Sequence, residues 1–413
     1  MNPEGVETTE TAKPRLWVVC EVYYPEKIST GYYLTSIAEG LADEFDVKVL
    51  CGQPNYAARG TVAPKYEFRN GTEIFRAPST TLDKNVIAYR IVNMVTLGTS
   101  MFFKALRHFR RGDRVLVVTA PPSLPYTIAP AALLRGASYV PLLHDCYPEI
   151  LIATKKARPG SLIVKMINVC NRWLFKHANR LIVVGRDMKE MMEKKTAGLD
   201  VPIDVIPNWA DLEIIRPTPR DDNALLKELA IEDKFVLTCA GNLGNPTEIE
   251  TIVDAAERLL GEPQFHFIFI GSGVKRKWLE DEVAKRSLSN VTLLGVRPRE
   301  EQIVFLNACD IGLIGLVKGM WGAAMPSRTY NMLAAGKPMI AFTEPGSEVA
   351  RVIDEEQVGW RIMPGDVDEF IGAIRTAYEC RAELNEMGRR AHAAAHAKYS
   401  LETAIETYRK SLE

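Results

Sequence analysis

The sequence predicts an α/β protein made of two doubly wound, Rossmann-like domains that face each other across a cleft. Short apolar runs alternate with amphipathic helical patterns, and the alternation pauses once, at the polar, proline-bearing stretch Ile214–Asp222, before it restarts. The length of 413 residues, with 47% apolar and 25% charged residues, suits two or three domains with sizeable cores. Because strand–helix–strand connections are right-handed, each set of runs should form a parallel sheet that binds ligands at the carboxyl ends of its strands.

The expected strands fall into two sets. The first set is Leu16–Cys20, Val47–Cys51, Val115–Ala120, Tyr139–His144, Leu181–Gly185 and Ile203–Asn208, with helical patterns such as Tyr32–Glu44 and Ser161–His177 between them. The second set is Phe235–Gly241, Phe265–Gly271, Val291–Gly295, Ile311–Leu316 and Pro338–Phe342. The predicted boundaries are a disordered leader over 1–14, a first domain over 15–213, a second over 214–395, and a C-terminal helix over 396–413 that can cross back to the first domain.

Composition and charge exclude several classes of function. The formal net charge is -1, so nothing global points to nucleic acid as a partner. The seven cysteines form no Cys-x-x-Cys pair, which argues against a zinc site and against a disulfide framework. Their scatter fits a reducing cytoplasm.

The most informative segment is Met325–Pro338, MPSRTYNMLAAGKP. It predicts a helix that opens at Pro326 and is followed by a buried strand over Met339–Phe342. A helix N-terminus presents unpaired N–H groups and a partial positive charge, so it can bind an anion such as a phosphate. Ser327 can cap the helix or donate to a phosphate, and Arg328 adds a forked cation beside it. The alternative is an ordinary loop–helix–strand unit with a good cap.

Two glycine-bearing turns follow strands of the second set. In AGNLG, Gly241 lets the backbone approach a phosphate or sugar closely, and Asn242 can both donate and accept hydrogen bonds. Gly271 and Gly273 fall at the next strand end, before a helix. Arg297 lies in the turn after the third strand, where exposed backbone groups could meet a flat base edge. Plain glycine-rich turns without a ligand are the alternative.

The first set of strands offers groups for the other side of the predicted cleft. Ser29, Thr30 and Gly31 lie in a loop before a helix and form a second candidate anion site. His144 and Asp145 close a buried strand, so they should lie at its carboxyl end. Such a pair is a candidate for catalysis, although a histidine there can also be purely structural.

The segment Asn85–Arg111 has a different character. It holds an uncharged stretch, Ile91–Phe103, that is too short to span a bilayer, followed by Lys104, Arg107, Arg110 and Arg111. Apolar residues with a basic end can lie in a membrane interface. A helix buried between the sheet and the surface is the alternative.

Seven motifs are spaced along the chain: GQPNYAARG (Gly52–Gly60), HDCYPE (His144–Glu149), VIPNWAD (Val205–Asp211), GNLG (Gly241–Gly244), GSG (Gly271–Gly273), MPSRTYNMLAAGKPMIA (Met325–Ala341) and the later Gly359-Trp360. Through their order and spacing the chain resembles the GT-B glycosyltransferases of the retaining family-four type, over essentially its full length after the leader. It is most similar to the branch associated with bacterial surface polysaccharide and O-antigen assembly. The resemblance implies an acceptor-side first domain and a second domain that binds a nucleotide sugar.

Some positions depart from the wider family. Where that family has an Arg, a Lys about five residues later and an E-x7-E motif, this chain has Asn242, Thr247, Ala323 and Asn331. The resemblance therefore implies that phosphate charge is met by Arg328, Lys318 and the helix start at Ser327. Asn331 could still hydrogen-bond a ribose hydroxyl, less strongly than a carboxylate would.

The implied reaction is transfer of a sugar from a nucleotide sugar, with a UDP-sugar favoured, to a glycan or lipid-linked acceptor. Stabilising the charge on the departing diphosphate is the main task, and Arg328 with the helix dipole can do this without a metal or a cofactor. The Asp-x-Asp at Asp366–Asp368 falls at an expected helix start and not at a central strand end. His144 would contact the donor sugar, and Asp145 would orient it or the acceptor. The expected location is the cytoplasm, with peripheral contact to an anionic inner membrane face.

Two other functions stay open. One is a nucleotide-sugar epimerase or hydrolase on the same fold. The other is a non-catalytic scaffold in polysaccharide assembly, suggested by the missing Arg, Lys and two Glu. A transferase needs an acceptor, an epimerase or hydrolase does not, and a scaffold turns over no nucleotide sugar.

Overall fold

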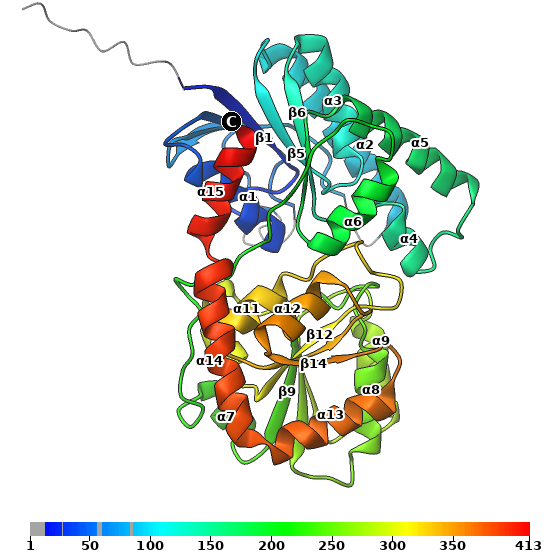
Figure 1. Ribbon diagram of the computed structural model, residues 1–413, viewed down its shortest axis with the longest axis vertical. Coiled ribbons are helices and arrows are strands. Elements are labelled where there is room, and N and C mark those ends of the chain that lie inside the picture. The colour runs from blue at the N-terminus through cyan, green and yellow to red at the C-terminus, as the bar shows by residue number, and fades with distance from the viewer. Residues whose placement is uncertain (1–12, 27, 56–59, 83–85) are drawn as a thin grey trace, which may run out of the picture. The chain divides into compact units, whose positions relative to one another are not determined.

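The computed structural model describes residues 13–26, 28–55, 60–82 and 86–413, and it divides into two compact units (Figure 1). The described residues up to Leu142, with Leu412, form the first unit, and Leu143–Ser411 with Glu413 form the second. The domain boundaries at 15–213, 214–395 and 396–413 stay a prediction.

Some expectations lie outside the described residues. They concern most of the leader over 1–14, the middle of the Gly52–Gly60 motif, and Asn85 at the start of the candidate membrane segment.

The first unit is a parallel sheet with one antiparallel edge strand. Its strands lie in the order β3-β4-β2-β1-β5-β6, and every pair is parallel except β3 with β4. The elements are β1 (Arg15–Val19), α1 (Ser29–Gly40), β2 (Asp46–Cys51), β3 (Tyr66–Arg69), β4 (Thr72–Arg76), α2 (Ile87–His108), β5 (Arg114–Val118), α3 (Leu124–Arg135) and β6 (Ser138–Leu143). Four apolar runs expected as strands are confirmed as β1, β2, β5 and β6. Most of their side chains are buried, as expected for central strands of a parallel sheet.

The β3–β4 hairpin was missed in the sequence. Asn70 and Gly71 form its turn, with φ of 43° and 77°. Positive φ at two successive residues, with an Asn-Gly pair, is the signature of a two-residue hairpin turn. That pair was a readable signal, but β3 alternates exposed and half-buried residues and lacks the apolar run used to find the other strands.

The second unit holds a six-stranded, fully parallel sheet in the order β11-β10-β9-β12-β13-β14. Before it come α4 (Glu149–Ala153), α5 (Leu162–His177), β7 (Leu181–Val183), α6 (Arg186–Lys195) and β8 (Ile203–Val205), with β7 and β8 paired in parallel. The sheet and its helices are α7 (Ala224–Leu229), β9 (Phe235–Ala240), α8 (Glu250–Arg258), β10 (Phe265–Ile270), α9 (Arg276–Lys285), β11 (Val291–Leu294), a 3-10 turn (Arg299–Glu301), α10 (Gln302–Asn307), β12 (Ile311–Gly315), α11 (Arg328–Ala334), β13 (Met339–Phe342), α12 (Glu348–Glu356), β14 (Gly359–Ile362) and α13 (Val367–Glu379).

Helices cover both faces of this sheet. Side chains of α8, α9 and α13 pack with Phe235, Phe267 and other alternate residues of the strands in one apolar core. On the opposite face Met332 of α11 approaches Gly312 so closely that a Cβ there would lie 2.5 Å from its sulfur. The expected Rossmann-like architecture is confirmed for both sheets, and β14 is an additional strand that the sequence did not reveal.

The C-terminal segment is helical, in two pieces: α14 (Arg381–Lys398) and α15 (Leu401–Leu412). Ser400 separates them, and its hydroxyl accepts from the Thr403 N–H at the start of α15. The Ser411 hydroxyl donates to the carboxylate of Asp204 on β8. In the part of the chain that the structure describes, no helix is long and apolar enough to cross a bilayer.

Candidate active site

The His144–Asp145 pair follows β6 directly and lies against the loop that precedes α11. Asp145 forms an isolated antiparallel bridge with Ala324. The Cys146 N–H donates to the Ala323 carbonyl at 2.8 Å. Two motifs that are far apart in the sequence, HDCYPE and MPSRTYNMLAAGKP, therefore meet in the second unit.

A small apolar cluster supports this meeting. Ile150 packs with Leu316, Met320 and Ala323, and all four are buried. Ile150 belongs to α4, Leu316 precedes the loop, and Met320 and Ala323 lie in it. The cluster therefore fixes the position of one motif relative to the other.

Burial shifts both ionisable groups of the pair toward their neutral forms. It lowers the pKa of His144 from the ordinary 6.5 to about 4, and it raises the pKa of Asp145 from 3.8 to about 6. At pH 7 the imidazole is therefore neutral and the carboxyl is mostly ionised. A neutral imidazole can hydrogen-bond a sugar hydroxyl, and a carboxylate of that pKa can orient a hydroxyl or accept its proton.

Two carboxylates hold the backbone of the 318–324 loop. Glu344 accepts from the N–H groups of Gly319 at 2.8 Å and Trp321 at 3.3 Å. Asp187 accepts from the N–H of Gly322 at 3.0 Å. The loop therefore has a defined path before it meets the Asp145 bridge.

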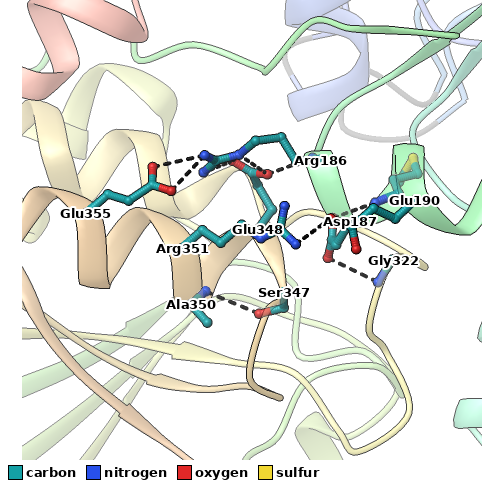
Figure 2. A network of polar contacts seen from close by, with 10 residues as sticks. Arg186, Asp187, Glu190, Gly322, Ser347, Glu348, Ala350, Arg351 and Glu355 are labelled. Atoms are coloured by element: carbon teal, nitrogen blue, oxygen red, sulfur yellow. Dashed lines mark hydrogen bonds and ion pairs between the residues drawn. The ribbon is translucent and has the colours of Figure 1, made fainter.

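Figure 2 shows a polar network between the start of α6 and α12. Glu348, buried in the first turn of α12, accepts from the backbone N–H of Arg186 at 2.6 Å and from its guanidinium at 3.0 Å. The same guanidinium contacts the exposed carboxylate of Glu355 at 2.8 Å. A further ion pair joins Arg351 to Glu190 at 2.6 Å. The network thus ties α12 to the turn that holds the loop.

The two glycine-bearing turns pack backbone against backbone. Gly271 has φ of +134°, and a Cβ there would lie 2.0 Å from the Gly241 carbonyl oxygen. A Cβ on Gly273 would lie 2.4 Å from the carbonyl oxygen of Leu243. The Leu243 N–H also donates to Ser272 O at 2.9 Å. These glycines are therefore required by the contact between the turns, whatever else they bind.

Arg328 lies across the exposed Gly241–Asn242 turn. Its guanidinium donates to the Asn242 carbonyl at 3.2 Å, and a Cβ on Gly241 would meet it at 3.3 Å. Thr247, at the position of the family's lysine, donates to the same carbonyl at 2.9 Å. The structure thus places one cation directly at the turn where the sequence predicted a phosphate.

Other predicted residues of the α11 segment have mixed outcomes. Ser327 has helical backbone angles, and its side chain forms no cap hydrogen bond, so the predicted cap is wrong and the phosphate alternative stays a prediction. Among the described residues, the side-chain oxygen of Asn331 is buried without a hydrogen-bond partner, so it is available to a donor such as a ribose hydroxyl. Lys318 is exposed on the loop.

One candidate, Arg297, and the Asp-x-Asp segment have structural partners. Arg297 contacts Glu301 at 3.2 Å and Glu228 at 3.4 Å, so its charge is already matched. In the Asp-x-Asp segment, Asp366 caps α13 through the Glu369 N–H, and Asp368 pairs with an exposed arginine of α8.

The Ser29-Thr30-Gly31 segment lies in the first unit and is described there alone. It is the first turn of α1 and not a loop before it, since the Tyr32 N–H bonds to Ile28 O at 2.9 Å. A Cβ on Gly31 would lie 2.5 Å from Glu26 O, which explains the glycine.

Sequence reasoning missed the carboxylates that hold the 318–324 loop and α12. A signal existed, because Arg186 and Asp187 directly follow a strand end and Glu348 opens a helix. Which of these groups would meet could not be read from the sequence, because the partners are separated by whole elements.

Comparisons with known proteins show the family of this chain. A model described as "Glycosyl transferases group 1" matches residues 221–394, and one described as "Glycosyl transferase 4-like domain" matches residues 30–209. A probable glycosyltransferase WbjE of Pseudomonas aeruginosa is 30% identical over 400 residues, covering 95% of this chain and 96% of that protein. A putative colanic acid biosynthesis glycosyl transferase WcaI of Escherichia coli is 23% identical, covering 86% and 90%. The Escherichia coli UDP-Gal:alpha-D-GlcNAc-diphosphoundecaprenol alpha-1,3-galactosyltransferase is 26% identical, covering 59% and 61%.

Solved structures share the fold. Sucrose-phosphate synthase of Thermosynechococcus elongatus has a TM-score of 0.75 at 15% identity, covering 97% of this chain and 99% of that one. Anabaena Alr3699/HepE in complex with UDP-glucose has a TM-score of 0.71 at 15% identity, covering 96% and 99%. With both halves matched by family models and a relative at 30% identity over nearly the whole length, the chain belongs to the group 1 glycosyltransferases with a glycosyl transferase 4-like N-terminal half and the GT-B fold.

Proposed function

We propose that this glycosyltransferase moves a sugar from a UDP-sugar to a lipid-linked or glycan acceptor in bacterial surface polysaccharide synthesis. The names of two relatives support this, one assigned to colanic acid synthesis and one to transfer from UDP-Gal onto a diphosphoundecaprenol-linked sugar. The solved complex of Alr3699/HepE with UDP-glucose supports the same class of donor.

The observation that carries the proposal is the position of Arg328 over the Gly241–Asn242 turn. An exposed turn with glycine backbone on one side and a guanidinium on the other suits a diphosphate, because the two parts of the site contact different faces of the phosphates. Lys318 and Ser327 would add to the phosphate contact. Asn331 would bind a ribose hydroxyl of the same nucleotide.

His144 and Asp145 would act on the sugar. The imidazole, neutral at pH 7, would contact donor sugar hydroxyls, and Asp145 would orient the donor or the acceptor. Ser29, Thr30 and Gly31 would bind the acceptor or a phosphate of its carrier. Arg297, held by two glutamates, would serve the base only through its backbone.

The reaction would proceed with retention and without a metal. Arg328 supplies the positive charge for the leaving diphosphate, and the leaving phosphate can itself take the acceptor proton. Activity should therefore persist in EDTA. The anomeric configuration of the product, read by NMR, should equal that of the donor, and an inverted product would contradict retention.

The test of the main proposal is turnover of UDP-sugars with and without a lipid-linked acceptor. Release of UDP that depends on the acceptor supports a transferase. Epimerised or hydrolysed sugar without acceptor would indicate the epimerase or hydrolase alternative, and binding without any turnover would indicate a scaffold.

His144→Gln and Asp145→Asn test the sugar-contacting pair. Both variants should stay folded and lose transfer, while UDP affinity stays unchanged because the proposal assigns the pair to the sugar and not to the nucleotide. A variant that unfolds while its folded fraction keeps the full rate would make the pair structural.

Membrane contact through the 86–111 segment is also proposed. Tyr89, Ile91, Val95 and Phe103 of α2 are exposed, whereas Met101 is buried with other residues of the opposite side. At the end of α2 a cavity of about 460 Å³ is lined by Phe103, Lys104, Arg107 and His108 together with Lys65, Tyr66 and Phe75. Lys104 and Arg107 help to lower the pKa of His108 after burial, which reflects the positive field of this cavity. An anionic headgroup would suit it.

Charge reversal of Lys104, Arg107, Arg110 and Arg111 tests this contact. Binding to anionic vesicles at low salt should fall in the reversed variant while the fold survives. Unchanged binding would favour the alternative that α2 is a helix packed between the sheet and the surface and does not contact a membrane.

A further inference from the structure

Helix α5 is apolar on two opposite sides. Val164, Leu174 and Phe175 face the protein and are buried. On the other side lies what we call the α5 stripe: Leu162, Ile163, Met166, Val169 and Trp173, of which Leu162 is 84% and Val169 71% exposed. Spacings of three, four and seven residues put Leu162, Met166, Val169 and Trp173 on one side of the helix, opposite the buried Val164 and Phe175, with Ile163 at its edge.

An exposed apolar row of this length needs an explanation. Single apolar residues on a surface are ordinary, but a continuous stripe marks a surface that meets an apolar partner. The buried side of α5 already anchors the helix to the protein, so the stripe is not needed for folding.

The charge around the stripe is strongly one-sided. Residues 150–186 contain no Asp or Glu, in a chain with 52 acidic residues and a net charge of -1. Six exposed cations lie in the segment: Lys155, Lys156, Arg158, Lys165, Arg172 and Lys176. Lys165, Arg172 and Lys176 are seven and four residues apart, so they form a row along the helix. This row lies next to one edge of the stripe.

We propose that the α5 stripe and its six cations dock the protein on the surface of an anionic lipid bilayer. A helix with apolar side chains, a bordering row of Lys and Arg and a tryptophan is suited to lie in the plane of a membrane interface. The cations match the negative potential of anionic lipids, and the stripe can enter the acyl boundary. This contact goes beyond sugar transfer and does not depend on it, and it uses an element other than α2.

The experiment is co-sedimentation of the full chain with phosphatidylcholine vesicles, with and without phosphatidylglycerol. Wild-type protein should bind only the anionic vesicles and be released by salt. The triple variant Lys165→Glu, Arg172→Glu, Lys176→Glu should lower the partition coefficient roughly 100-fold or more, since each basic residue is worth about a factor of five. Leu162→Ser with Val169→Ser should weaken binding while leaving its salt dependence in place.

A matched control separates a local effect from one of total charge. Lys227→Glu, Lys277→Glu and Lys285→Glu change the net charge equally at exposed lysines outside α5, and they should leave vesicle binding nearly unchanged. UDP affinity and the melting temperature should be the same in all variants, which shows that they fold.

Two results would overturn the proposal. One is vesicle binding that does not depend on α5, seen as no binding of wild type to anionic vesicles at low salt or as equal binding by wild type and both α5 variants. The other is a stripe variant that alters only the oligomeric state in sedimentation velocity, which would assign the stripe to contact between copies of the chain.

Discussion

Arg328 serves both the fold and the proposed chemistry. It holds the Gly241–Asn242 turn through the Asn242 carbonyl, and in the proposed mechanism it supplies positive charge to the leaving diphosphate. Where the wider family has an arginine and a lysine this chain has Asn242 and Thr247, and Arg328 brings positive charge to the turn from another element.

Replacement of Arg328 by alanine should therefore weaken UDP binding by about 1.5–3 kcal/mol, the range for a hydrogen bond to a charged group. Arg328→Lys should recover part of the loss, because it keeps the charge but not the fork. Isothermal titration measures both. Arg375→Ala, an exposed arginine of α13 paired with Glu262, is the control and should bind UDP as wild type does. Wild-type affinity in Arg328→Ala would place the diphosphate elsewhere.

Asp145 and His144 should impose opposite pH dependences on stability. The pKa of the Asp145 carboxyl is about 6 in the folded protein and 3.8 in the unfolded chain. Asp145 therefore favours folding at low pH, and this contribution is lost as the pH rises through 6. The His144 pKa of about 4 when folded, against 6.5 unfolded, favours folding at high pH and loses this contribution as pH falls through 4.

In wild-type protein these two contributions offset each other between pH 4 and 6. In Asp145→Asn only the histidine remains, so the free energy of unfolding should rise more steeply with pH than in wild type over that interval. His144→Gln should show the opposite change. Urea unfolding at a series of pH values measures both slopes, and identical slopes in all three proteins would mean that neither group is desolvated as described.

At the level of elements, the 318–324 loop is the part of the site that depends most on distant support. Glu344 and Asp187 hold its backbone, and α12 is tied to the same turn through Glu348 and Arg186. The loop meets the Asp145 bridge and carries Lys318, so loosening its support should disturb the proposed sugar site and the Lys318 part of the proposed diphosphate site.

Glu348→Gln and Glu355→Gln form a matched pair at one arginine. Glu348 is buried and accepts hydrogen bonds from three nitrogen atoms of Arg186, so its change should cost about 1.5–3 kcal/mol of unfolding free energy. Glu355 is exposed, and its change should cost less than about 1 kcal/mol. Chemical denaturation gives both values, and equal losses would contradict the role assigned to burial.

Sequence patterns predicted elements better than they predicted contacts between elements. β9 and β10 were found because buried parallel strands are continuous apolar runs, and the start of α11 was placed within two residues of the structure by its proline. The β3 edge strand lacked such a run, and Ser327 proved to be inside the helical geometry instead of capping it. The contact of Arg328 with Asn242 depends on where the start of α11 lies relative to the end of β9, which local sequence does not encode.

On the scale of the whole molecule, a nucleotide that binds the folded protein must raise its stability by mass action. At a UDP concentration about 100 times Kd the gain is about 2.7 kcal/mol. A thermal-shift series with UDP, GDP, ADP and dTDP should therefore show the largest rise in Tm with UDP. The rise should shrink in Arg328→Ala. A larger shift with another nucleotide would correct the proposed donor.

The position of Cys170 gives the α5 stripe a practical consequence. Of the seven cysteines, all within the described residues, five are buried, Cys380 is half-buried and Cys170 is exposed. Cys170 lies one helical turn from Met166, at the border of the stripe. Maleimide labelling of the natural protein should therefore attach an environment-sensitive fluorophore beside the stripe first, with no engineered site. In an oxidising buffer the same thiol should join two chains by a disulfide, so purification without a reductant should yield covalent dimers that dithiothreitol separates.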